Sequence, residues 1–172
     1  MKTKLFISFL FICFAITALY INHLSFSPLK ERDFQKLFGK HKGNIEKVCE
    51  VDYLGLSFHG ELFEIYLYKV DTIFLDLNYP NYSESWEEKE FSDKILTSKW
   101  AKCPPDSITQ RMFEFTLTAN NFSQEKYFDY FYIDLNNLKN YYSYFYVNEL
   151  ENYFILYCLE KRTFYYVRRK GL

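Results

Sequence analysis

Residues 5–21 form an uninterrupted run without charge, LFISFLFICFAITALYI, directly after a short amino terminus that carries Lys2 and Lys4. A helix that spans the hydrocarbon core of a bilayer needs about 20 predominantly apolar residues. With residues 22–24 as an interfacial edge, the run reaches that length. The sequence therefore predicts an N-terminal helix that enters a membrane, and this constrains where the rest of the chain folds and works.

The same run could instead be removed as a signal peptide. Such a peptide has a positive start, an apolar segment of about 7–15 residues and small residues two apart before the cleavage site. Here the apolar segment is longer, and Ala15 and Ala18 are three residues apart. We therefore expect a retained single-pass anchor. The alternative is a cleaved signal, which would leave a secreted or periplasmic protein.

The basic residues predict the orientation of this anchor. Lys2 and Lys4 flank the run without any nearby acid, whereas residues 30–33 on its other side alternate basic and acidic side chains. Because positively charged flanks stay in the cytoplasm, we expect the amino terminus on the cytoplasmic side of the cell membrane and the C-terminal domain on the outer side.

Charge and composition limit the class of protein that the rest of the chain can form. It has 25% charged and 49% hydrophobic residues and a net charge of −1, which is typical of a globular domain and gives no electrostatic case for binding nucleic acid. We divide the chain into an anchor or signal over 1–22, a spacer and helix over 23–44, and one extracytoplasmic domain over 45–172.

A helix and a hairpin are predicted first. Pro28 suits the first turn of a helix, and apolar residues recur at helical spacing over 29–38 before Gly39. Residues 45–53 and 63–68 alternate with a period of two instead. This pattern predicts a β-hairpin with one wet face, carrying tyrosines, and one dry face.

The middle of the chain gives weaker signals. Residues 73–77 could form a third short strand. Residues 85–98 are charged, with Phe91 and Ile95 four positions apart, which predicts a surface helix. Residues 111–118 alternate cleanly between apolar and polar side chains, which predicts a strand.

The last third reads as a meander over 127–135, 141–147, 153–159 and 163–169, with asparagine-rich or charged breaks between the segments. Residues 127–135 could also be helical, and 153–159 is apolar on both faces, as a central strand would be. The predicted fold class is α+β: a twisted antiparallel sheet of about six to eight strands with one or two packed helices.

Aromatic residues make up 22% of the chain. An AT-rich coding sequence and strand propensity account for this without a functional reason, but Tyr66 and Tyr68 are candidate interaction residues. Tyr166, Arg168 and Arg169 belong to a basic, aromatic tail. It could contact anionic lipid headgroups or an acidic partner, although charges on a last strand more often protect an exposed edge.

Catalytic signals are sparse. His59, Glu61 and Glu64 form the most enzyme-like cluster, since a histidine beside carboxylates can exchange protons or hold a metal. Their spacing matches no HExxH pattern, and the sequence contains no GxSxG motif, no CxxC pair and no glycine-rich phosphate loop. The simpler interpretation is a solvated hairpin turn, and no cofactor or metal is predicted.

Cysteine usage leaves the redox state open. Beyond the anchor the chain has Cys49, Cys103 and Cys158. In an oxidising compartment, one disulfide among these three and one remaining thiol would be consistent with the odd number.

These observations favour a non-catalytic, membrane-anchored binding protein outside the cytoplasm, with a protein or an envelope component as its partner. An immunity- or inhibitor-like role would fit the size and architecture but rests on no particular residue. Two alternatives remain: an envelope hydrolase that uses His59 with Glu61 or Glu64, and a secreted domain that binds a small ligand.

Overall fold

The computed structural model describes residues 2–25, 27–39, 43–54, 61–71, 75–82, 85–86, 89–90, 92–118 and 130–171. The chain divides into two compact units, Met1–Lys30 and Glu31–Leu172. The first unit contains helix α1 (Lys2–Ser25), so a helix does form over the predicted anchor. Across the described residues, no helix has both the length and the apolar character that crossing a membrane would require.

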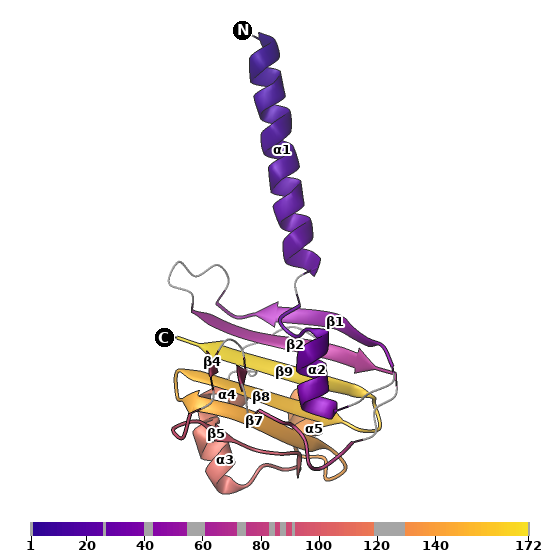
Figure 1. Ribbon diagram of the computed structural model, residues 1–172, viewed down its shortest axis with the longest axis vertical. Coiled ribbons are helices and arrows are strands. Elements are labelled where there is room, and N and C mark those ends of the chain that lie inside the picture. The colour runs from indigo at the N-terminus through magenta and orange to yellow at the C-terminus, as the bar shows by residue number, and fades with distance from the viewer. Residues whose placement is uncertain are drawn as a thin grey trace. The chain divides into compact units, whose positions relative to one another are not determined.

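The second unit is built on a seven-stranded antiparallel sheet (Figure 1). Its strands lie in the order β1-β2-β9-β8-β7-β5, and β6 also pairs with β7. Two further short strands pair only with each other. The bounds are β1 Ile45–Asp52, β2 Leu62–Val70, β3 Ser85–Trp86, β4 Lys89–Glu90, β5 Leu96–Thr97, β6 Ala101–Lys102, β7 Tyr141–Asn148, β8 Glu151–Cys158 and β9 Thr163–Lys170. The predicted α+β class, hairpin and C-terminal meander are confirmed.

The position of the last two strands corrects one prediction and confirms another. β8 lies between β9 and β7 and is buried along its whole length, as the apolar segment 153–159 predicted. β9 was expected at an exposed edge, and this is wrong, because β9 lies between β2 and β8. The arginines of β9 therefore do not protect a sheet edge.

Helix α2 (Glu31–Phe38) confirms the predicted helix over 29–38. Its acidic first turn suits the positive end of the helix dipole, and Gly39 follows it with a φ of 70°, a left-handed conformation that glycine adopts without strain. The buried side of α2 carries Phe34, Leu37 and Phe38. These side chains cover one face of the sheet.

The strand predicted over 111–118 is wrong, because this segment lies in the short helices α3 (Ser107–Met112) and α4 (Glu114–Thr118). Asp106 caps α3 by accepting a hydrogen bond from the Thr109 backbone N–H at 2.7 Å. The alternation misled because Phe113 and Leu117, four residues apart, are buried, whereas Phe115 between them is half-exposed.

Three other predicted segments have different outcomes. The surface helix over 85–98 is wrong, since β3, β4 and β5 lie there, with Ile95 buried and Phe91 outside the described residues. Part of the segment 73–77 also lies outside them, and 75–77 contains no strand. For 127–135 the helical alternative holds over α5 (Phe131–Leu135), and 127–129 are not described.

The sheet is covered on both faces. We call one the aromatic face: α2, Tyr82, Trp86 and Trp100 pack against it. Its strands contribute Tyr66, Tyr68, Tyr153, Tyr157, Phe164 and Tyr166. We call the other the helix face, where α3, α4 and α5 bury Phe113, Leu117, Phe131 and Leu135 against the sheet. The predicted wet, tyrosine-bearing face of the hairpin is wrong, because Tyr66 and Tyr68 are 2% and 1% exposed.

Candidate functional site

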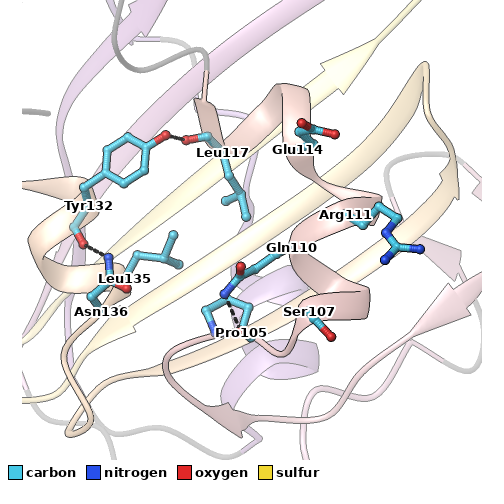
Figure 2. Close-up of a pocket in the computed structure, with 9 residues that line it drawn as sticks. All are labelled: Pro105, Ser107, Gln110, Arg111, Glu114, Leu117, Tyr132, Leu135 and Asn136. Atoms are coloured by element: carbon cyan, nitrogen blue, oxygen red, sulfur yellow. Dashed lines mark hydrogen bonds between the residues drawn. The ribbon is translucent and has the colours of Figure 1, made fainter.

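The helix layer leaves a cavity of about 450 Å³ where α3 and α4 face α5. Figure 2 shows α3 and α4 on one side of this cavity and α5 on the other. We call it the α5 cavity. Its lining residues are Pro105, Ser107, Gln110, Arg111, Glu114, Leu117, Tyr132, Leu135 and Asn136.

Several polar groups in the α5 cavity are already held by backbone carbonyls. The Gln110 side-chain amide donates to the Pro105 carbonyl at 2.7 Å, the Tyr132 hydroxyl donates to the Leu117 carbonyl, and the Asn136 amide donates to the Tyr132 carbonyl at 2.8 Å. These bonds fix the walls (Figure 2). The Ser107 hydroxyl and the Arg111 guanidinium also line the cavity, so donors and acceptors stand beside the apolar Leu117 and Leu135. This mixture is typical of a recognition site.

A second cavity of about 460 Å³ lies on the other side of α4. It is lined by Arg111, Met112, Glu114, Phe115, Glu149, Leu150 and Arg169. Two of these residues, Arg111 and Glu114, also line the α5 cavity. We call it the Arg169 cavity.

Arg169 is the most unusual side chain of this cavity, because it carries a charge and is only 8% exposed. Its guanidinium lies over the Phe115 ring, 4.0 Å from the ring centroid. Burial lowers the pKa of Arg169, while Glu149 and Tyr146 act in the opposite direction. Among the described residues, its buried Nε has no hydrogen-bond partner.

A buried polar cluster anchors α5 on the helix face. Asp134 is 2% exposed, and its carboxylate accepts from the Lys161 ammonium at 2.7 Å and from the Tyr165 hydroxyl at 3.0 Å. Burial, and then the Asp134 charge, raise the pKa values of Tyr165 and Cys158. The cluster is fully engaged within the protein, so its role is to hold α5 in place.

The predicted catalytic candidates do not come together as a described site. His59 lies outside the described residues. Glu64 is held by Arg168, whose Nη1 donates to its carboxylate at 2.8 Å, and by the Tyr66 hydroxyl at 2.9 Å. Glu61 is half-buried and approaches Gly171, at the end of β9. Within the described ranges, no three His, Cys, Asp or Glu side chains are grouped so that they could hold a metal ion.

The predicted interaction residues on the sheet lie in the interior. Tyr66, Tyr68 and Tyr166 are at most 2% exposed. The Tyr166 hydroxyl accepts a hydrogen bond from the indole N–H of Trp86 at 3.0 Å, and burial raises the pKa of Tyr66. These tyrosines therefore contribute to packing on the aromatic face, whereas Arg169 belongs to a cavity on the helix face.

In the described part of the chain, the cysteines are free thiols. Cys103 and Cys158 are buried free thiols, and no bridge joins either of them to Cys49. Burial, together with the nearby Asp134, raises the pKa of Cys103 to about 12. A thiol so firmly protonated is a poor nucleophile at neutral pH.

The sequence reasoning missed the residues that line both cavities, because it assigned 111–118 to a strand. Two signals could have revealed the helices. Asp106 stands three residues before Thr109, which is the spacing of an N-cap, and Phe113 and Leu117 are four residues apart, as on one side of a helix.

The fold and the cavities define a small α+β protein with a covered antiparallel sheet and recesses on its helix layer. Comparison of the chain with protein-family models, with curated proteins and with solved structures finds no match.

Proposed function

We propose that this protein is a non-catalytic binding protein that presents its helix layer to a protein partner and is held at a membrane, outside the cytoplasm, by residues 5–21. The observation that carries the proposal is the α5 cavity, whose walls are fixed by internal hydrogen bonds and whose helices expose large apolar side chains.

Exposed apolar side chains around a recess favour a protein partner. Ile108 on α3 is 71% exposed, Ile133 on α5 is 64% exposed, and Leu138 just after α5 is 69% exposed. Each of the three lies within two residues of one that lines the α5 cavity, and exposed apolar side chains beside polar groups suit an interaction surface. The hydroxyl of Ser107 and the guanidinium of Arg111 supply such groups in the α5 cavity.

The non-catalytic part of the proposal is supported by the engagement of the acidic groups. A general base needs a carboxylate or imidazole that can accept a proton from a substrate. The Glu64 carboxylate instead pairs with Arg168 and Tyr66, and the Asp134 carboxylate pairs with Lys161 and Tyr165.

Site-specific photocrosslinking in the parent cell tests the partner surface. A benzophenone amino acid replaces Ile133 or Ile108 in the full chain. The matched controls are Leu77 and Leu159, which are 55% and 42% exposed in other parts of the second unit. We expect a discrete protein adduct from the two helix-layer positions only. Equal adducts at the controls, or none at the helix layer, would contradict the proposal.

The membrane part rests on the uncharged run and on α1, where Phe11 and Phe14 are both 73% exposed. Exposed apolar side chains of a helix partition favourably into lipid. We expect the full chain to sediment with membranes, and the double substitution of Phe11 and Phe14 by Lys to release it, because buried charge is costly there. Replacing Leu77 and Leu159 by Lys adds the same charge outside both proposed contact regions and should release nothing. If the variant with both phenylalanines replaced by Lys still sedimented with membranes, membrane association through residues 5–21 would be refuted.

A further inference from the structure

The Arg169 cavity shares Arg111 and Glu114 with the α5 cavity, but its central feature, a buried cation, belongs only to the Arg169 cavity. A guanidinium removed from water is costly unless an anion pairs with it. The Arg169 residue is 8% exposed, and within the described part of the chain its buried Nε has no hydrogen-bond partner. Glu149 lines the same cavity, but no ion pair joins the two side chains among the described residues.

We propose that the Arg169 cavity binds the carboxylate of a small ligand that carries an apolar side chain, such as an apolar amino acid or the last residue of a peptide.

The geometry around Arg169 favours a carboxylate. Phe115 covers one side of the guanidinium at 4.0 Å from the ring centroid, and a stacked guanidinium still has its edge available. That edge matches a carboxylate with two parallel hydrogen bonds. Arg169 reaches the cavity from β9, an interior strand of the sheet, so its position is fixed by strand pairing on both sides.

The other lining residues narrow the ligand further. Glu114 and Glu149 line the cavity beside Arg111 and Arg169, so the two charges of each sign balance. A dianion such as a phosphate group would meet both glutamates, whereas a single carboxylate adds only one charge. Leu150 and Phe115, 45% and 49% exposed, provide apolar surface for the ligand's side chain. The volume of about 460 Å³ suits a small ligand.

Titration calorimetry on the full chain in detergent micelles tests this site with three probes. N-acetyl-L-leucine carries the carboxylate of a peptide end, L-leucine is the free amino acid, and N-acetyl-L-leucinamide lacks the carboxylate. We expect at least one acid to bind and the amide to bind at least about tenfold more weakly, because a lost charge-assisted pair costs about 1.5–3 kcal/mol. Whichever of the two acids binds more tightly shows whether the natural ligand is a peptide end or a free amino acid. Equal binding of acid and amide, or no binding of either acid at millimolar concentration, would overturn the proposal.

Variants assign the binding to Arg169. Arg169→Gln should weaken the acid at least about tenfold, whereas Lys170→Gln, which removes the same charge one residue further along β9, should not. Leu150→Glu tests the site without touching the buried arginine. Leu150 is 45% exposed, so the fold should tolerate the change while the added charge repels the carboxylate. Unchanged affinity in both Arg169→Gln and Leu150→Glu would refute the site, with thermal unfolding confirming that each variant is folded.

Discussion

The two faces of the sheet differ in how completely they are filled. On the aromatic face, Phe38 stacks on Trp100 with ring centroids 5.4 Å apart and also contacts Tyr157 and Phe164. On the helix face, three short helices cover the same strands but leave two cavities of about 450 and 460 Å³. Among the described residues, one face is packed with aromatic rings in mutual contact, and the other has cavities between the elements that cover it.

The polar groups follow the same division. The indole N–H of Trp100 donates to the Leu37 carbonyl at 3.0 Å, and the hydroxyls of Tyr82 and Ser143 lie 3.0 Å apart. In the described part of the chain, two arginines of β9 have a buried Nε without a hydrogen-bond partner, Arg168 on the aromatic face and Arg169 on the helix face. Arg168 is nevertheless held by Glu64, to which its Nη1 donates at 2.8 Å, whereas Arg169 forms no ion pair with a described residue. Satisfied groups stabilise the fold, whereas an unsatisfied one is costly. The comparison therefore assigns the abundant tyrosines to stability and directs the search for function to the helix face.

The largest expected effect comes from truncating one ring on each face. Phe38→Ala should lower the free energy of unfolding by about 3–5 kcal/mol, because a 3% exposed ring leaves a cavity among three aromatic neighbours. Phe115→Ala on the helix face should cost only about 1 kcal/mol, since that ring is 49% exposed. Urea unfolding of both variants measures the difference. Similar losses would show that the two faces are equally packed.

The parts of the fold that were predicted correctly depend on local patterns. β7, β8 and β9 follow one another with short turns, so alternation and the breaks between segments were sufficient. The short strands of 85–97 depend on distant contacts instead. Trp86 is buried because its indole bonds Tyr166, 80 residues later in the chain. No window of sequence around Trp86 contains that information.

The candidate site was less predictable than the fold. Arg169 was singled out as part of a basic tail, but its burial depends on β9 having a partner strand on each side and on Phe115 lying over it. Whether a strand is interior or at an edge is decided by the topology of the whole sheet. Part of the walls of both cavities comes from α3 and α4, which the alternation over 111–118 disguised as a strand. The Asp106 and Phe113–Leu117 spacings indicate these helices, but how they sit against α5 and Arg169 depends on the whole fold.

A smaller effect is expected from removing one hydroxyl on each face. Tyr166→Phe keeps the ring but leaves the Trp86 indole N–H, 3.0 Å from the lost oxygen, buried without its acceptor. The loss of unfolding free energy should be about 1–3 kcal/mol. Tyr146→Phe is the matched control on the helix face, where Tyr146 is half-buried beside Phe113, and it should change stability by less than about 0.5 kcal/mol. Equal losses of unfolding free energy in the two variants would show that the hydrogen bond between Trp86 and Tyr166 does not contribute more to stability than the hydroxyl of Tyr146.

The smallest expected effect is a difference between the two faces in the pH at which stability begins to fall. The pKa of Cys103, on the helix face, is raised from 9.0 to about 12 by burial, and burial also raises the pKa of Tyr82, on the aromatic face, above its ordinary 10.0. A raised pKa means that the folded state holds its proton while the unfolded chain loses it. Stability is therefore fully present below the unfolded pKa and falls as pH rises above it. The thiol should respond about one pH unit earlier than the tyrosine.

Stability measured from pH 8 to 10.5 in the parent chain, in Cys103→Ala and in Tyr82→Phe tests this order. At pH 10, Cys103 should account for about 1.4 kcal/mol of the loss, because one pH unit corresponds to that energy. The cysteine variant should have a flatter curve from about pH 9, and the tyrosine variant only from about pH 10. What matters is the slope and not the absolute stability, since each substitution also changes packing. If the cysteine variant kept the parent slope between these values, Cys103 would not be held protonated in the folded protein, and the helix face would admit solvent down to its core.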